Sequence, residues 1–425
     1  MAPGTFRISR RRALSLAGAS AAAGVGAGVV AGRAVPDASA GATDPGSLAY
    51  PFHGDHQAGI TTPAQDRLHF AVFDVGDVSR EDLVGLLKDW TTAAASMSQG
   101  GSAGEFAPDA GPYEAPPEDT GEAMDLGPAG LTITFGFGPT LFTTAGGVDR
   151  FGIAALRPRA LAPLPAFSGD MLEERISGGD LCIQACADDP QVAVHAIRNL
   201  SRIAFGRASL RYSQLGFGRT SSTSTTQVTP RNLFGFKDGT ANVKAEDRAA
   251  VDEHVWVAEG DDQAWMAGGS YLVSRKVRMN VEPWDRTRLS EQERSIGRTK
   301  GKGAPLSGGD EFTPPDFSAG GSGGEPLIAG QSHMRLAHPD TNGGARMLRR
   351  GYNFVDGNDE LGRLDGGLFF LCFQRDPERA FIPVQTRLAG SDLLNEYIRH
   401  VGSGIFAVPG GASEGSYVGA RLFES

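Results

Sequence analysis

The stretch Leu181-Cys-Ile-Gln-Ala-Cys-Ala-Asp-Asp-Pro190 and the segment after it decide the fold class. Residues 181–185 form an apolar run with the length of a buried strand. Asp189 then begins a helical pattern that runs to about Phe205, and residues 211–217 return to a strand pattern. This order of strand, helix and strand lacks the regular spacing of repeated βαβ units, so it predicts an α+β fold with antiparallel sheets.

Outside this stretch, strands and helices follow one another in a similar order. The second half of the chain resembles a loose repeat of the first, with halves near 68–230 and 250–425, although their identity is too low to prove a duplication. Gly- and Pro-rich insertions are predicted at 98–128 and 300–330. The remaining predicted elements are strands at 68–74, 131–135, 270–279 and 367–373, and helices at 79–97, 289–296 and 392–400.

The N-terminus has the features of a targeting segment. Ser9-Arg-Arg-Arg-Ala-Leu14 carries a twin-arginine pattern, an uncharged Ala/Gly/Val-rich run follows, and Ala38-Ser-Ala40 offers a small-residue cleavage site. A transmembrane anchor is the alternative, but alanine and glycine partition weakly into membranes. We therefore expect residues 1–40 to be a twin-arginine signal peptide. Export to the periplasm, cell envelope or medium would follow, with no stable membrane span after cleavage.

Charge and cysteine content narrow the class of protein. The net charge is −10, and the predicted signal peptide is basic, so the remaining chain is more acidic still. An acidic chain disfavours nucleic acid and anionic membrane surfaces as partners. Cys182, Cys186 and Cys372 lie in apolar strand patterns without the spacing of a zinc site, which indicates buried thiols.

His333 is a candidate metal ligand among the eight histidines. It lies in Gln331-Ser-His-Met-Arg-Leu-Ala-His-Pro-Asp340, directly after a glycine-rich run. A neutral imidazole is a good axial ligand for haem iron. His338 competes for the same role, and an ordinary surface histidine remains the simplest explanation for either. His254 and His400 lie in polar surroundings and carry no such prediction.

Asn232-Leu-Phe-Gly-Phe-Lys-Asp-Gly-Thr-Ala-Asn242 is the second candidate site. Gly235 and Gly239 place the carboxylate of Asp238 in a tight turn, and glycine lets the backbone approach a ligand closely. The alternative is an ordinary Asp-Gly turn, which is common in proteins. Alone, this motif is a weak signal.

Together, these motifs resemble the dye-decolourising peroxidases. Gly235-Phe-Lys-Asp-Gly239 is similar to their GxxDG motif, and Gly235 to Asn242 resembles most closely the exported deferrochelatase/peroxidase branch. Other similar strings occur in the same order across nearly all of the chain after the signal peptide. They are His56-Gln-Ala-Gly-Ile60, Gly179-Asp-Leu181, Ala187-Asp-Asp-Pro190, Ser332-His-Met-Arg-Leu-Ala337, Leu348-Arg-Arg-Gly-Tyr352 and Phe373-Gln-Arg-Asp376.

The resemblance implies two ferredoxin-like halves, 41–230 and 231–425, with one haem b in the second half. It implies that His333 is the proximal iron ligand, Asp238 the distal acid-base group and Arg349 the distal arginine. Arg349 is preferred to Arg350 because the family pattern is Arg, one residue, then a small residue.

The resemblance also implies residues that border the haem. His338 and Asp340 stand where relatives often have Asn and a basic residue, which puts the propionate contact there in doubt. Arg275 and Arg278 are weaker candidates for propionate partners, since either could be a solvated strand residue. The bordering residues implied are Gly239, Thr240, Ala241, His338, Pro339 and Asp340.

The function implied is oxidation of dyes, phenolics or other organic reductants by hydrogen peroxide. Two alternatives are a deferrochelatase that releases iron from intact porphyrin and a non-catalytic haem carrier. Iron-uptake or copper-linked proteins of the cell envelope are possible partners under this resemblance. Tyr352 and Tyr397 are candidates to carry electrons to the surface, although core packing explains each equally well.

Overall fold

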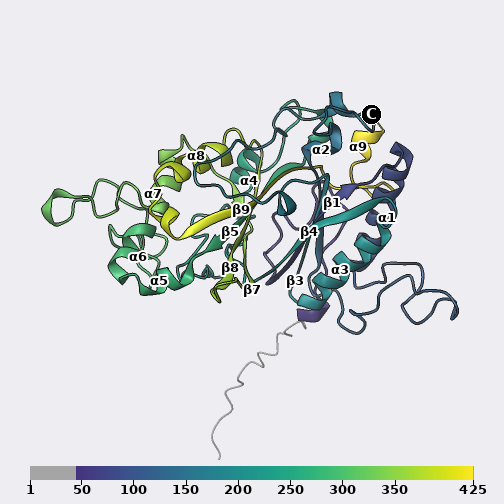
Figure 1. Ribbon diagram of the computed structural model, residues 1–425, viewed down its shortest axis with the longest axis horizontal. Helices are drawn as coiled ribbons and strands as arrows, with labels where there is room; N and C mark the ends of the chain where they lie inside the picture. Colours follow the sequence, from purple (N-terminus) through teal and green to yellow (C-terminus); the bar gives the residue numbers. More distant parts are fainter. Residues whose placement is uncertain (1–44, 425) are drawn as a thin grey trace, which may run out of the picture. The chain divides into compact units, whose positions relative to one another are not determined.

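The computed structural model describes residues 45–424, and the predicted signal peptide lies outside the described residues. Within the described part of the chain, no helix is long and apolar enough to cross a bilayer. The major elements form two successive βαββαβ units, shown in Figure 1. This architecture confirms the predicted α+β class with antiparallel sheets.

The N-terminal unit contains a four-stranded antiparallel sheet in the order β2-β3-β1-β4. This order and the βαββαβ connectivity make the unit ferredoxin-like. Helices α1 and α3 pack against each other and beside this sheet (Figure 1). The elements are β1 (Arg67–Val75), α1 (Arg80–Met97), β2 (Thr132–Phe137), β3 (Leu181–Ala187), α3 (Pro190–Ile203) and β4 (Ala208–Phe217).

The C-terminal unit repeats this plan with shorter helices. Its antiparallel order is β9-β5-β8, with β6 and β7 both paired to β8 as two parts of one interrupted strand. The elements are β5 (Ser270–Met279), α5 (Val281–Arg286), α6 (Leu289–Ile296), β6 (Leu348–Arg349), β7 (Tyr352–Asn358), β8 (Leu364–Gln374), α8 (Phe381–Ser391) and β9 (Ile398–Val408).

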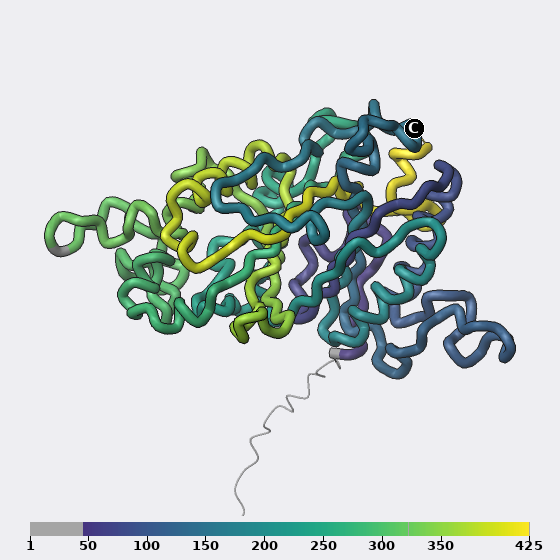
Figure 2. Tube along the Cα trace, in the orientation of Figure 1, coloured from purple at the N-terminus to yellow at the C-terminus, as the bar shows by residue number. Residues whose placement is uncertain are grey.

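Two single backbone pairings join the sheets into a closed ring. Phe137 of β2 pairs with Ala407 of β9, and Phe217 of β4 pairs with Asn353 of β7. The chain end returns to the N-terminal unit, as Figure 2 shows. There, Arg80 donates a hydrogen bond to the carbonyl of Phe423 at 2.7 Å. The predicted boundary between the two halves at residue 230 stays a prediction. The described residues form one compact unit, so their contacts mark no boundary there.

Local sequence signals explain the well-predicted helices. Ser79 caps α1 in a reciprocal capping box with Asp82, and the Asp189 side chain caps the first turn of α3. The apolar side of α1 carries Trp90, which is 1% exposed and packs near Phe73 and Phe135. The core of the N-terminal unit is therefore filled between its sheet and its helices.

The predicted helix over 392–400 is wrong. Asp392 instead caps a short 3-10 turn, Leu393–Glu396, and Ile398 begins the long strand β9. The preceding helix α8 was missed because it contains Pro383 and Gly390, which ordinarily disfavour a helix. Pro383 is tolerated since it lies in the first turn, where the backbone N–H has no helical partner.

The remaining segments agree with the predictions. The insertion at 98–128 contains no helix or strand within the described residues, and that at 300–330 contains only the 3-10 turn Ser322–Gly324. All three cysteines are buried and free, as expected. The short helices are α2 (Pro139–Phe142), α4 (Arg248–His254), α7 (His333–Ala337) and α9 (Ala420–Phe423).

Candidate functional site

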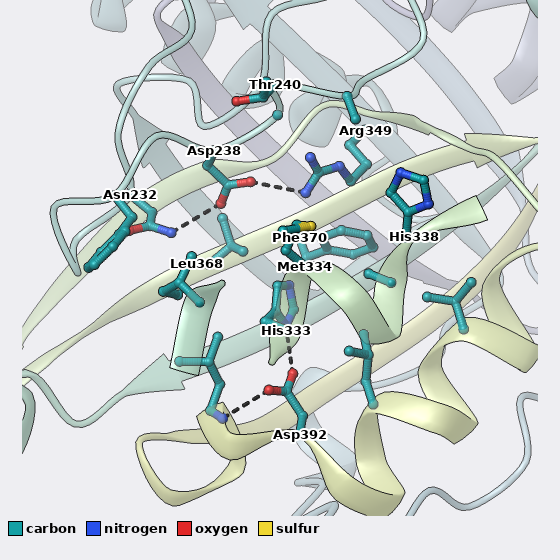
Figure 3. A pocket seen from close by; sticks show the side chains of 18 of the residues that line it. Asn232, Asp238, Thr240, His333, Met334, His338, Arg349, Leu368, Phe370 and Asp392 are labelled. Carbon is teal, nitrogen blue, oxygen red and sulfur yellow. Dashed lines mark hydrogen bonds and ion pairs between the residues drawn. The ribbon is translucent and has the colours of Figure 1, made fainter. Parts of the chain in front are cut away.

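A cavity of about 510 Å³ lies in the C-terminal unit, between its sheet and the helices α7 and α8. This volume is in the range of a cofactor or ligand site. Figure 3 shows His333 and Asp392 on one side of the cavity and Asp238 with Arg349 on the other. The apolar lining includes Phe234, Phe236, Val277, Met279, Ile296, Leu368, Phe370, Val384, Leu388 and Ile398.

His333 is fixed by a buried carboxylate. Its Nδ1 lies 2.6 Å from Oδ2 of Asp392, whose side chain is 1% exposed and whose other oxygen accepts the backbone N–H of Leu394 at 2.9 Å. The carboxylate can only accept, so Nδ1 carries the proton and Nε2 remains as the free lone pair. His333 is therefore oriented as a ligand that offers Nε2.

The charge of this pair affects the histidine. Burial lowers the pKa of His333, but the carboxylate of Asp392, with a smaller contribution from Asp238, outweighs burial and raises the pKa above its ordinary value. The same hydrogen bond makes the imidazole more electron-rich, which strengthens it as a ligand. Sequence reasoning missed Asp392, because no local signal links it to a histidine 59 residues away.

Asp238 lies on the opposite side of the cavity in the glycine-flanked turn. Gly239 has φ +83°, and a Cβ there would lie 2.9 Å from the backbone Cα of Ser221, so the turn requires glycine. The Nδ2 of Asn232 donates a hydrogen bond to Oδ2 of Asp238 at 3.2 Å. The carboxylate is therefore held in place but remains 15% exposed toward the cavity.

Arg349 is the partner of Asp238. Its Nη1 lies 2.9 Å from Oδ1 of Asp238. Asn242 fixes the backbone beneath it, since Oδ1 of Asn242 accepts the Arg349 N–H at 2.7 Å and Nδ2 donates to the Arg349 carbonyl at 2.8 Å. Asn242 thus connects the Asp238 loop to strand β6 through two hydrogen bonds. The sequence motif did not predict this structural role.

Arg350 points away from the cavity, as alternation along a strand requires. It is fully buried, and its guanidinium donates to the carbonyl of Thr62 at 2.5 Å and to the side chain of Gln65. Arg349, in contrast, lines the cavity. The geometry therefore separates the two adjacent arginines into one cavity residue and one core residue.

The other predicted bordering residues divide into two groups. His338 lines the cavity, and burial lowers its pKa. Asp340 does not line the cavity, because its side chain is 77% exposed and lies 3.5 Å from Nδ1 of His338 on the solvent side. The cavity-lining residues that sequence analysis also named are Gly239, Thr240, Ala241 and Pro339.

Arg275 and Arg278 also differ. Arg275 lines the cavity, is 2% exposed, pairs with Asp170 and donates to Oγ of Ser403 at 3.1 Å, while its Nε has no hydrogen-bond partner among the described residues. Arg278 lies outside the cavity and donates through Nε to Asp365 at 2.8 Å. Of these two arginines, Arg275 is therefore the one available to a group bound in this cavity.

His400 corrects one expectation. Sequence analysis placed it in polar surroundings, but its side chain is 13% exposed and lines the cavity beside Arg275. Burial, followed by repulsion from the charge of Arg275 and from the protonated form of His333, lowers the pKa of His400 to about 3. The ring is therefore neutral at physiological pH.

The protein alone offers too few ligands for a free metal ion. Within residues 45–424, no group of three or more His, Cys, Asp or Glu side chains could hold one. A metal at Nε2 of His333 would need most of its ligands from another molecule. A planar macrocycle that brings its own four nitrogen ligands satisfies this requirement and suits the apolar walls.

Both halves of the chain match known protein families. Residues 57–218 match the family "Dyp-type peroxidase, N-terminal", and residues 229–413 match "Dyp-type peroxidase, C-terminal". The dye-decolorizing peroxidase of Thermobifida fusca is 38% identical, covering 98% of this chain and 97% of that protein. The deferrochelatase of Escherichia coli K12 is also 38% identical, covering 99% and 98%.

Solved structures agree with the sequence comparison. Ferric DtpA from Streptomyces lividans superimposes with a TM-score of 0.81 at 44% identity, covering 89% of this chain and 98% of that one. A DyP-type peroxidase from Cellulomonas bogoriensis gives a TM-score of 0.79 at 38% identity, covering 90% and 100%. The chain therefore belongs to the Dyp-type peroxidase family and is a haem-dependent peroxidase.

Proposed function

We propose that the cavity in the C-terminal unit would hold one haem b, with His333 as the iron ligand and Asp238 and Arg349 on the peroxide side. The observation that carries this proposal is the arrangement in Figure 3, where the His333–Asp392 pair and the Asp238–Arg349 pair face the cavity from opposite sides. This arrangement offers a nitrogen ligand on one side of the cavity and a carboxylate with a guanidinium on the other.

The cavity fits haem in its chemistry. Nε2 of His333 offers one nitrogen ligand, and Leu368 and Phe370 offer apolar contacts for a porphyrin face. The buried guanidinium of Arg275, whose Nε lacks a partner among the described residues, suits a propionate carboxylate. We propose Arg275 rather than Arg278 for this contact. His338 and Pro339, which also line the cavity, would border the macrocycle.

The bound haem iron would supply the redox chemistry that cleaves the O–O bond of hydrogen peroxide. Asp238 would accept the proton of the inner peroxide oxygen and return it to the outer oxygen, which leaves as water. Arg349 would stabilise the negative charge that develops on that leaving oxygen. Asn232 and Asn242 would hold this pair in register. Over the whole cycle, two phenols and one peroxide give two phenoxyl radicals and two waters.

The proposal also covers the cellular location and the partner proteins of the enzyme. Residues 1–40 would export the folded chain by the twin-arginine route, because their pattern has the arginine pair, apolar run and cleavage site of such signals. The similarity to a deferrochelatase supports an iron-uptake partner in the cell envelope. A copper-linked partner is a second proposal, which no observation favours over the first.

The test of the proposed function follows the fate of the porphyrin. We expect turnover of an anthraquinone dye with hydrogen peroxide at mildly acidic pH, while the haem absorption is retained. Anaerobic incubation with haem and a reductant should give little fluorescent protoporphyrin. The reason is that His333, fixed by Asp392, would hold the iron, and no carboxylate cluster in residues 45–424 could accept it.

The two alternatives give different results in the same experiment. Catalytic release of metal-free porphyrin with negligible dye oxidation would make iron extraction the main activity. Haem binding with no reaction toward peroxide would indicate a carrier, although the Asp238–Arg349 pair would then have no purpose.

A further inference from the structure

Phe312 lies exposed on the wall of the cavity. Its side chain is 70% exposed, and it is the one exposed large hydrophobic residue of the described chain that also lines this cavity. Single exposed hydrophobic side chains are common and need no explanation. Phe205, for example, is 90% exposed but lies away from the cavity. Phe312 differs because it lines the cavity, as do Pro314 and Pro315, which are close to it in the chain.

The residue before Phe312 is anchored to the loop that carries Asp238. Glu311 is 8% exposed, forms an ion pair with Lys237 and accepts a hydrogen bond from Oγ1 of Thr240 at 3.2 Å. Nη1 of Arg298 donates to the Glu311 carbonyl at 2.8 Å. The position of Phe312 is therefore fixed relative to the peroxide side of the cavity.

The residues after Phe312 make the turn rigid. The N–H of Thr313 donates to the Asp310 carbonyl at 3.1 Å, and Oγ1 of Thr313 accepts the Asp310 N–H at 2.9 Å. Pro314 and Pro315 then restrict the backbone directly after this turn. Holding an aromatic side chain in water on a rigid turn forgoes the stabilisation that burial would give. An aromatic partner would recover part of it.

We propose that Phe312, with Pro314 and Pro315, forms the subsite where an aromatic organic reductant packs before it gives an electron to the haem. This proposal rests on the peroxidase function but adds the place and the residue that select the substrate. Offset or edge-to-face packing between two aromatic rings is favourable beyond the burial of their surface. The subsite therefore selects for a planar aromatic face.

The test compares two kinds of reductant with the haem-loaded enzyme. Phe312→Ala should raise the KM for an anthraquinone dye about threefold to tenfold, the range expected from losing one aromatic contact. Phe312→Tyr should restore the parent KM, because it keeps the ring. The KM for ferrocyanide, a one-electron reductant without an aromatic face, should stay unchanged in both variants. Phe205→Ala is the matched control and should leave all these constants unchanged.

Three results would overturn the subsite. They are an unchanged KM for the dye in Phe312→Ala, an equal rise in the KM for ferrocyanide, or a loss of haem, which would show that Phe312 packs on the cofactor. The rate of the Soret change with peroxide alone is measured in parallel. A parent enzyme that oxidises neither reductant would instead refute the peroxidase function, so the two failures are distinguishable.

Discussion

The two ferredoxin-like units have the same strand order but use the space between sheet and helices in different ways. In the N-terminal unit, α1 and α3 are long, and Trp90 fills the centre, where its indole N–H donates to the Leu200 carbonyl at 2.8 Å. In the C-terminal unit, α5 and α6 are short, and the sheet presents Arg275 and His400 to an open cavity. One topology thus gives a filled core and a binding site, depending on helix length and on a few polar strand residues.

The largest effect on haem binding and activity should come from removing His333, the proposed iron ligand in the cavity of the C-terminal unit. His333→Ala should lose haem or change its Soret band, and peroxidase activity should fall to background, because His333 is the cavity histidine that the buried carboxylate of Asp392 orients. Absorption spectra of the haem-loaded variants measure this. His338→Ala is the control for ligation and should keep haem with a parent-like Soret band. A parent-like spectrum for His333→Ala would refute the assignment.

The next largest effect concerns the filled unit. Trp90→Ala should lower the free energy of unfolding by about 3–5 kcal/mol, because it opens a cavity in a packed core. Leu388→Ala removes a side chain that already faces an open cavity, so in the haem-free protein it should cost much less. Urea denaturation of the two haem-free variants measures the difference. Equal losses would mean that the two units do not differ in packing.

Substitutions on the peroxide side of the cavity should slow the reaction with peroxide strongly without a comparable loss of stability. Asp238→Ala and Arg349→Leu should bind haem, and at least one should slow the Soret change with peroxide by about 10²-fold or more. Stopped-flow absorption measures this rate.

Arg350→Leu is the contrasting variant. Its parent side chain is buried among Thr62 and Gln65, so the substitution should lower the melting temperature and leave the peroxide step in the folded fraction nearly unchanged. A larger kinetic effect there than in Arg349→Leu would reverse the choice of arginine.

The smallest effect concerns the pH dependence of stability, which should differ between a histidine of the N-terminal unit and one of the C-terminal unit. Burial without a partner for Nδ1 lowers the pKa of His69, in β1, to about 4, whereas Asp392 raises that of His333. Because His69 is neutral in the folded protein, its contribution to stability is present above about pH 6.5 and is lost as the pH falls toward 4. The slope is at most about 1.4 kcal/mol per pH unit.

Denaturation of the haem-free protein between pH 7 and 4 tests this. His69→Gln should lose less stability than the parent over that range. Parallel curves would show that His69 does not contribute to the acid sensitivity.

The sequence predicted most elements because their signals are local. The capping box at Ser79 and the Asp189 cap mark α1 and α3, and apolar runs mark β3 and β5. Strand β9 was missed because Leu393, Leu394, Tyr397 and Ile398 have spacings that also suit a helix. Its strand conformation depends on pairing with β5, more than 100 residues earlier, which no local pattern records.

The site was predictable only in part for the same reason. Family motifs brought together Asp238, His333 and Arg349, which do line one cavity. Asp392 and Glu311 were missed, because each acts on a residue 59 or 74 positions away, and neither stands in a recognisable motif. Contacts over such separations follow from the fold and not from spacing along the chain.

The closed ring of strands has a consequence for the order of events during synthesis. Strand β9 pairs with both β5 and β2, and it carries the cavity residues Ile398 and His400. The four strands of the N-terminal sheet pair with one another and can form once β4 has emerged from the ribosome, but the core beside them also takes in Trp265, Val418 and Phe423 from later in the chain. Joining Phe137 to Ala407 closes a very long loop, which makes it a late step. The proposed haem site would therefore be complete only after β9 has paired, so haem loading would follow the synthesis of the C-terminal strand.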